Sequence, residues 1–458
     1  MIVKNIFRIL SSTLVLSTAL NSLITVDGNL ISKLTKSQRS DQNDHQQHDH
    51  LNDTLRMVFI IHRHGDRTPI QLYPKDPYQD QIKFWPDGWA QLTLNGKKRM
   101  FQLGKYLSRR YENFLGKSPR EVHVRSSGSD RCLESVSLLL AGLYPPKGRW
   151  KWNDNLGNNW QPFPIQTVPH EDDAMLNPES HCEKAKKILN LIYNSSEQVT
   201  NYRKSMESTI EYVQDNTGST NMDLIRAEQI FDVLFIEKSF NYKLPAWVDE
   251  NVYAKLEDIS AKTFLFSGMN REIQRFRTGL LLSDILRHIE ERHRSDKRLF
   301  IYSSHDTQIS VLLSALKEFN NLAPPFGATV LLELHQELED RSPFLKLFYL
   351  NVTESERPFE LSLNDCKRFD AAESVQPVQA QNQSNHCTLE RFHRSIKDLI
   401  PKDWQVECEN FDRLDDEPVS IFVLMATIIL TLIVMFSFIY FWLTANRHGS
   451  SYRLLPIN

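Results

Sequence analysis

An uninterrupted apolar run near the carboxyl end constrains this chain more than any other feature of its sequence. Residues 421–443, IFVLMATIILTLIVMFSFIYFWL, contain no charged side chain. A helix of this length spans the roughly 30 Å hydrocarbon core of a bilayer and satisfies its backbone hydrogen bonds internally. The run therefore predicts one transmembrane helix, so the rest of the chain must fold beside a membrane.

Charged residues on the two sides of this run indicate its orientation. Four acidic residues lie between 412 and 417, whereas Arg447 and Arg453 follow the run. Because positively charged flanks stay in the cytosol, we expect the tail 444–458 to be cytosolic. The preceding part of the chain is then lumenal or extracellular, which is a single-pass type I arrangement.

The N-terminus has the pattern of a secretory signal. Lys4 and Arg8 flank the start of an apolar stretch that ends among small residues near position 24. We expect 1–28 to be a signal peptide, with a retained N-terminal anchor as the alternative. The next segment, 29–54, contains the polar tract DQNDHQQHDH and is interpreted as a linker or propeptide, because nothing around its histidines predicts a rigid metal cage.

Glycosylation sequences and cysteines agree with translocation of the main part of the chain. Asn-x-Ser/Thr acceptors occur at Asn52, Asn194, Asn351 and Asn382. The five cysteines can form two bridges in an oxidising compartment and leave one thiol. A formal net charge of -3 provides no overall positive field, so nucleic acid is not an expected partner.

Three segments of the expected lumenal domain, 55–415, share one pattern. Each is an apolar, partly β-branched run that ends abruptly in polar residues and precedes a helix-like stretch. The runs are 57–65 (MVFIIHRHG), 122–127 (VHVRSS) and 299–306 (LFIYSSHD), and the helix-like stretches are 93–111, 130–143 and 307–319. This alternation predicts an α/β fold, in which a sheet is covered by helices. Between about 147 and 297, less regular helix-like runs predict a smaller, largely helical cap.

The reactive residues of these segments fall at the predicted strand ends. Ligands of open α/β sheets bind outside the carboxyl ends of the strands, so we expect the three segments to converge on one pocket. The first of them carries Arg63-His64-Gly65-Asp66-Arg67-Thr68-Pro69. Guanidinium groups match phosphate oxygens bidentately, and neighbouring cations keep an imidazole neutral and able to attack phosphorus. This segment therefore indicates a phosphate site.

Two details of this segment allow other interpretations. His62-x-His64-x-Asp66 is a pattern that binuclear metal hydrolases also use, but it is followed by Arg67, whose charge opposes a dication. We therefore expect His62 to be structural and no metal to bind there. Asp66 either orients His64 or pairs with a neighbouring arginine.

Together with the distant His305-Asp306, the heptapeptide resembles the signature of the histidine acid phosphatase family, Arg-His-Gly-x-Arg-x-Pro plus His-Asp. The resemblance also includes 88–111, 124–146 and 302–316 and covers roughly 55–408. It is greatest with the lysosomal and prostatic branch, and the apolar helix and short tail favour the lysosomal type. It implies a histidine-phosphatase-like fold, with a mixed sheet flanked by helices. It also implies metal-independent hydrolysis of phosphate monoesters at acid pH, through a covalent phosphohistidine and without a cofactor.

Carried over residue by residue, the resemblance implies that His64 is the nucleophile and that Asp306 protonates the leaving alcohol. The residues implied to bind the phosphoryl oxygens are Arg63, Arg67, Arg125 and His305. Three guanidiniums and an imidazolium would then stabilise the charge of the transferring group. Around Arg125 the family more often has Arg-Ser-Thr-Asp, from which Ser127 and Gly128 depart.

The same resemblance implies the pairing of the cysteines. It pairs Cys182 with Cys408 and Cys366 with Cys387. Cys132 is then expected to be a free, buried thiol rather than a nucleophile.

The tail contains Tyr452-x-x-Leu455, a spacing that resembles endosomal and lysosomal sorting signals. It predicts a cytosolic sorting adaptor as a partner and the lysosomal membrane as the location, with the cell surface as the alternative. Oligomeric state is left open, a homodimer included.

Two other functions stay open on the sequence. One is a membrane-bound recognition protein that has kept the phosphatase fold and lost turnover, although the intact His64 and Asp306 argue against it. The other is an enzyme of the same superfamily that is specific for inositol polyphosphates, or a phosphotransferase. The residues that set such specificity cannot be identified in the expected cap.

Overall fold

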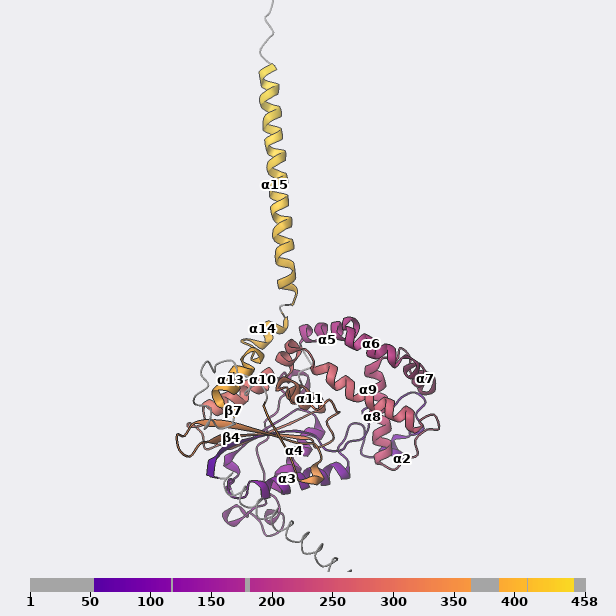
Figure 1. The fold of residues 1–458 in the computed structure, drawn as a ribbon, viewed down its shortest axis with the longest axis vertical. Helices are drawn as coiled ribbons and strands as arrows, with labels where there is room; N and C mark the ends of the chain where they lie inside the picture. The colour runs from indigo at the N-terminus through magenta and orange to yellow at the C-terminus, as the bar shows by residue number, and fades with distance from the viewer. Residues whose placement is uncertain (1–52, 117, 178–181, 364–386, 410, 449–458) are drawn as a thin grey trace, which may run out of the picture.

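One mixed sheet forms the centre of the computed structural model, which describes residues 53–116, 118–177, 182–363, 387–409 and 411–448 (Figure 1). The sheet has seven strands in the order β2-β3-β1-β4-β5-β6, and β7 pairs with β5. The strands are β1 (Leu55–Arg63), β2 (Val122–Ser126), β3 (Leu299–Ser304), β4 (Thr329–Gln336), β5 (Pro343–Leu350), β6 (Phe359–Leu361) and β7 (Cys387–Thr388). The expected mixed α/β sheet flanked by helices is confirmed.

The three strands predicted from the sequence are neighbours and run parallel. β1 pairs with β3 from Val58↔Leu299 to Arg63↔Ser304, and β2 pairs with β3 up to Ser126↔Ser303. Because parallel strands end at the same edge of a sheet, the segments that follow them meet there. The other half of the sheet, β4 to β7, is antiparallel, and its strands were not located from the sequence because none of them leads into a reactive motif.

Helices cover both faces of the sheet, which explains why β1 is apolar without alternation. Phe59 and Ile61 pack on one face in a core with residues of α10 (Arg271–Glu290) and α11 (Asp306–Ala315). Val58 and Ile60 face the other way, toward α3 (Leu94–Arg110) and α4 (Asp130–Leu143). Figure 1 shows α3 and α4 on one side of the sheet and α10, α11 and α13 on the other. The sheet is therefore held rigidly between two apolar layers.

A helical layer with its own core lies beside the sheet, on the right of Figure 1. Its helices are α5 (Glu183–Ser195), α6 (Glu197–Ser205), α7 (Glu207–Thr217), α8 (Leu224–Ser239) and α9 (Glu250–Gly268). They fall within the range expected for the cap, whose boundaries 147–297 remain an interpretation. We call these five helices the cap.

A disulfide between Cys182 and Cys408 joins the residue before α5 to α14 (Trp404–Glu409), as expected. Cys132 is buried with a free thiol, also as expected, and burial raises the pKa of this thiol to about 12. Cys366 lies outside the described residues, so its bridge stays a prediction.

The remaining elements are short apart from the last helix. They are α2 (Gln81–Phe84), α13 (Leu389–Ile396), α15 (Phe411–His448) and the 3-10 helices Pro119–Glu121, Gly148–Trp150, Leu156–Asn158, His170–Asp172, Thr353–Ser355 and Lys397–Leu399. Among the glycosylation sequences, Asn194 is exposed on α5 and Asn351 is partly buried after β5. Asn52 and Asn382 lie outside the described residues, and all four remain predicted sites.

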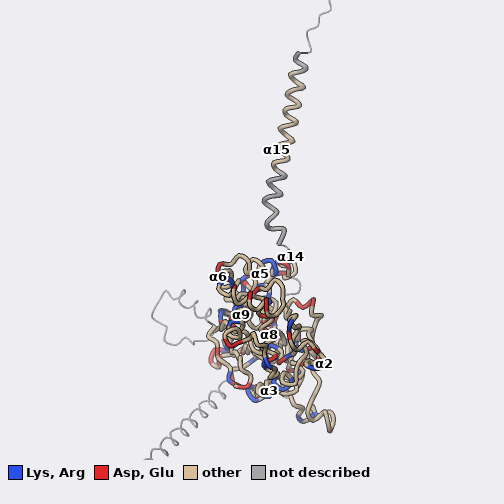
Figure 2. The backbone as a smooth tube through the Cα atoms, turned by 90° about the vertical axis from the view of Figure 1, so that its right-hand side faces the viewer, with Lys and Arg blue, Asp and Glu red and all other residues tan. Residues whose placement is uncertain are grey.

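The helix α15 contains the apolar run identified in the sequence. Its segment Met425–Thr444 is long and apolar enough to cross a membrane, and none of it is buried against the protein. Figures 1 and 2 show α15 extending away from the folded body, and the tan part of this helix in Figure 2 has no blue or red segment. Of the expected signal peptide, linker and cytosolic tail, 1–52 and 449–458 lie outside the described residues.

Candidate active site

The loop after β1 holds His64 at the carboxyl edge of the sheet. The His64 amide donates to the Ser304 carbonyl at 3.0 Å, and the His64 carbonyl accepts from the Gly327 amide at 3.0 Å. At the next residue, a Cβ on Gly65 would lie 2.8 Å from the Gly96 carbonyl oxygen in α3. Glycine is therefore needed where this loop meets the helix, and the backbone around His64 is fixed on both sides.

The imidazole of His64 is neutral and has one defined tautomer. Its Nδ1 lies 2.8 Å from the Gly65 carbonyl oxygen, which can only accept, so Nδ1 carries the proton and Nε2 keeps its lone pair. Burial lowers the pKa of His64 well below its ordinary value, and Arg63 and Arg131 lower it further. The ring thus stays unprotonated, and nucleophilic, in mild acid.

Arg63 and Asp306 form an ion pair beside this imidazole. Nη2 of Arg63 lies 2.6 Å from Oδ2 of Asp306, and its guanidinium stacks 4.1 Å above the Phe326 ring. Burial opposes ionisation of Asp306, but Arg63 and Arg67 outweigh it, so the pKa of this carboxyl is lowered. With no phosphate bound, Asp306 is therefore ionised.

Arg67 is held by the cap. Its two terminal nitrogens donate to Asp232 of α8 at 2.9 and 3.1 Å, a bidentate pair. One turn earlier on the same helix, burial and the nearby Asp232 raise the pKa of Glu228 to about 8. Neither acidic residue was identified from the sequence, because their distance of more than 150 residues from the Arg-His-Gly segment gives no local signal.

His305 is the residue before α11 and lies near His64, with ring centroids 5.6 Å apart. Burial and Arg131 lower the pKa of His305 to about 3, so the ring is neutral rather than the expected imidazolium. Its Nδ1 lies 3.4 Å from Nη2 of Arg131 and its Nε2 lies 3.0 Å from Oγ of Ser127. Because arginine can only donate, Nε2 carries the ring proton.

Arg125, which we expected to bind phosphate, is not brought into this cluster. Its guanidinium donates to Asp173 at 2.7 Å and to the Ser126 carbonyl. Asp173 is 1% exposed, so the pair is a buried structural contact. Arg125 lies within β2, one residue before its end, and this placement turns its side chain to the Asp173 loop instead of to the strand edge.

Arg131, which was not identified from the sequence, lies close to both histidines of the cluster. It lies in the first turn of α4, and its charge lowers the pKa values of both His64 and His305. Its Nε is buried and donates to no residue in the described part of the chain. A signal for it exists in the sequence, because a cation in the first turn of a helix opposes the helix dipole unless an anion binds there.

The two other interpretations of the Arg-His-Gly segment are also clarified. Asp66 pairs with Arg99 at 2.6 Å, so its carboxylate does not join the two histidines in a ligand cluster. His62 is fully buried, and its Nδ1 lies 3.0 Å from the Arg63 carbonyl oxygen. A His-x-His-x-Asp metal site is therefore not formed by these three residues.

Two cavities open onto this cluster from the side of the cap. One, of about 540 Å³, is lined by Arg67 and Asp306 and by residues of α5, α8 and α9. The other, of about 460 Å³, is lined by Arg63, Asp306 and Phe326. A small ligand can thus reach the ion pair from the cap side.

A model of the histidine phosphatase superfamily (branch 2) matches residues 54–350, which include every residue of this cluster. The chain belongs to this superfamily. Bovine prostatic acid phosphatase is 36% identical over 361 residues, which are 76% of this chain and 90% of that protein. Lysosomal acid phosphatase of rat is 32% identical over 408 residues, 86% of this chain and 90% of that protein.

Solved structures agree on the histidine phosphatase fold. The phytase of Citrobacter braakii superposes with a TM-score of 0.56 at 16% identity, covering 77% of this chain and all (100%) of that one. The phytase of Hafnia alvei gives 0.55 at 16% identity, covering 76% of this chain and 97% of that one. At this identity the likeness concerns the fold alone.

Proposed function

We propose that this chain hydrolyses phosphate monoesters at acid pH by transferring the phosphoryl group to Nε2 of His64 and then to water. A phosphohistidine intermediate is general for the superfamily. The observation that carries the proposal is the unprotonated Nε2 of His64 among Arg63, Arg67 and Arg131. The relatives named acid phosphatases support the same activity.

The cations around His64 would hold the phosphate. Arg63 and Arg131 each keep a buried Nε without a partner among the described residues. The helices α4 and α11 both begin at this edge, so their positive ends add to the field. Charge that develops on the equatorial oxygens in the transition state would be stabilised by groups that are already in place.

Asp306 would protonate the leaving alcohol. In the ligand-free site Arg63 lowers its pKa, but a bound phosphate dianion would draw Arg63 to itself and add negative charge beside the carboxyl. Both changes raise the pKa of Asp306, so a neutral acid forms when substrate binds in an acidic compartment. In the second step the same carboxylate would accept a proton from water, and His64 would be freed.

The cavity walls favour substrates with a single phosphate. Beyond the arginines, the smaller cavity carries the acidic side chains of Asp232 and Glu257 and the rings of Phe231 and Phe235. Carboxylates repel additional phosphates, whereas rings accept an aromatic leaving group. We therefore propose substrates with a single phosphate as the preferred class and inositol polyphosphates as the second. Measurement of kcat/KM for phenyl phosphate and for inositol hexakisphosphate distinguishes between the two classes.

Arg131→Ala is expected to lower kcat/KM for p-nitrophenyl phosphate by about 10²-fold, the typical effect of removing one donor to a transition-state oxyanion. Arg125→Ala is the matched variant, since it removes the same kind of side chain six positions earlier in the same strand-helix unit. It should lower the thermal unfolding temperature, because the buried carboxylate of Asp173 loses its ion pair, while kcat/KM changes less than about 3-fold.

Both variants are assayed below the unfolding temperature of the less stable one, per folded protein. A loss in Arg125→Ala equal to that in Arg131→Ala would contradict the assignment and return Arg125 to the phosphate site. Inhibition by vanadate provides a second measurement, because a bipyramidal oxyanion should bind more weakly to Arg131→Ala alone.

We further propose that the protein is delivered to the lysosomal membrane in a type I orientation by a sorting adaptor that binds Tyr452 and Leu455. The lysosomal relatives and the apolar segment of α15 support a lysosomal membrane protein. Tyr452→Ala should increase the surface-biotinylated fraction severalfold without changing phosphatase activity, and Tyr440→Ala, within the apolar segment, serves as the control. An unchanged distribution would favour the cell-surface alternative.

A further inference from the structure

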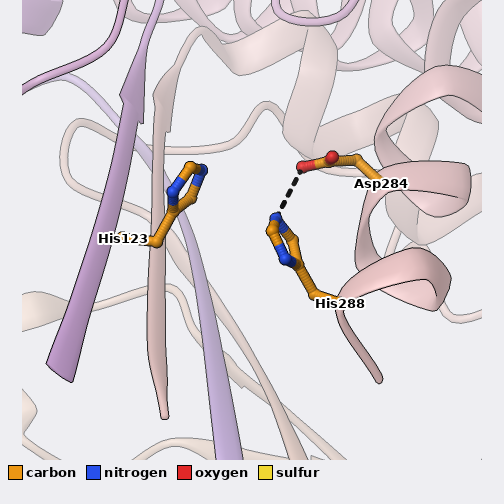
Figure 3. Close-up of side chains that lie close together, drawn as sticks. All are labelled: His123, Asp284 and His288. Atoms are coloured by element: carbon orange, nitrogen blue, oxygen red, sulfur yellow. Dashed lines mark ion pairs between the residues drawn. The ribbon is translucent and has the colours of Figure 1, made fainter. Parts of the chain in front are cut away.

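Two histidines and one aspartate converge between β2 and α10 (Figure 3). Asp284 and His288 are four residues apart on α10, so they lie on one face of that helix, and His123 reaches them from β2. One ligand atom from each residue lies within 4.8 Å of the other two, and all three side chains are partly buried. The phosphatase mechanism uses none of them.

Surrounding residues hold the three side chains in this arrangement. The hydroxyl of Tyr302, a fully buried side chain, donates to Oδ2 of Asp284 at 2.7 Å. The rings of His123 and His288 lie 5.0 Å apart, and the His288 ring lies 4.4 Å from Phe300. A hydrogen-bonded carboxylate and packed imidazoles are the supports that metal ligands in proteins usually have.

A positive group already occupies part of this cluster. Nη2 of Arg287 lies 3.0 Å from Nε2 of His288 and also contacts Oδ1 of Asp284. This guanidinium therefore bridges two of the three candidate ligands. Its side chain is 49% exposed, so it can turn into solvent and leave both ligand atoms free. The cluster thus favours a cation, and Arg287 is the competitor of any metal ion.

We propose that His123, Asp284 and His288 bind one Zn²⁺ ion and thereby clamp β2 to α10. Two imidazole nitrogens and one carboxylate oxygen are a common zinc ligand set, and a water would complete the tetrahedron. The site is separate from the phosphate site. His123 pairs with Phe300, five residues before His305, and at about 3.3 Å per strand residue this places it some 16 Å along the sheet from the catalytic edge.

Zinc titration of the metal-free, detergent-solubilised full chain at neutral pH tests the proposal. Calorimetry should show one more bound Zn²⁺ in the wild type than in His123→Ala, because any zinc held elsewhere in the chain remains in the variant. The extra ion should raise the unfolding temperature of the wild type, since it binds only the folded state. His293→Ala, an exposed histidine just beyond α10, should behave as the wild type.

Arg287→Gln is a variant for which we expect a gain of zinc affinity, and misfolding cannot produce such a gain. Removal of the competing guanidinium should tighten zinc binding by at least about 10-fold, whereas Tyr302→Phe, which removes the support of Asp284, should weaken it by about 10- to 100-fold. Equal zinc stoichiometry and equal unfolding shifts in wild type and His123→Ala would overturn the site, as would unchanged affinity in Arg287→Gln. Phosphatase activity is measured in parallel and should be the same in all of these variants.

Discussion

His64→Ala is expected to reduce kcat by on the order of 10⁴- to 10⁶-fold, the range found when a covalent nucleophile is removed. The phosphoenzyme should disappear as well, because no other neutral imidazole in the cluster has a free Nε2. The ring of His305 donates its Nε2 proton to Ser127 and accepts at Nδ1 from Arg131. Its lone pair is therefore not available to replace that of His64.

The measurement is rapid mixing with ³²P-labelled p-nitrophenyl phosphate, quenched in base because phosphohistidine is labile in acid. Thermal unfolding should remain cooperative, since the role of the imidazole is chemical. His293→Ala, which removes an exposed histidine just beyond α10, serves as the control for loss of a histidine. Acid-labile label at the wild-type level on His64→Ala would refute this nucleophile and, with it, the proposed function.

The second large effect is expected for Asp306→Asn with alkyl phosphates. General acid catalysis contributes about 10²- to 10⁴-fold, and a poor leaving group needs all of it. For p-nitrophenyl phosphate the loss should be below about 10-fold, because that phenolate departs without a proton. A loss of equal size for both esters would show that Asp306 acts only through its ion pair with Arg63.

The pH dependence provides an independent check on the same residue. In the enzyme–substrate complex the acid must be protonated, so kcat of the wild type with alkyl phosphates should fall as pH rises through the pKa of Asp306. Asn carries no such proton, and the profile of Asp306→Asn should lose this limb. Protonation of His64 should not lower kcat in mild acid, because burial and Arg63 hold the pKa of its imidazole well below 6.5.

The parts of the fold that were predicted correctly are those with local signals. The runs 57–65 and 299–306 are apolar on both faces because helices cover both sides of the sheet, whereas 122–127 is apolar on one face. Each is followed by a helix pattern, and this alternation predicts parallel pairing. The strands β4 and β5 carry no comparable signal, because antiparallel pairing adds no helix and no reactive residue.

The sequence analysis included Arg125 in the candidate site, whereas in the structure Arg131 contacts His305 and Arg125 pairs with Asp173. Arg125 and Arg131 lie six positions apart in one strand-helix unit. The sequence analysis selected Arg125, near the end of the strand, over Arg131, at the start of the helix. The helix dipole gives the physical reason for Arg131, since a cation placed against it gains stability only when an anion arrives. Asp232, which holds Arg67 from the cap, had no signal at all because it is 165 residues away.

The sequence by itself determined the chemistry of the chain: an apolar helix of membrane length, a histidine between arginines at one strand end and a His-Asp at another. These depend on residue type and near neighbours, which a sequence contains. Only the tertiary structure decided which guanidinium lies near His64 and which ring nitrogen of His64 keeps its lone pair. It also brought His123 close to Asp284 and His288. Such facts depend on side-chain directions between segments far apart in the chain, and packing alone sets those directions.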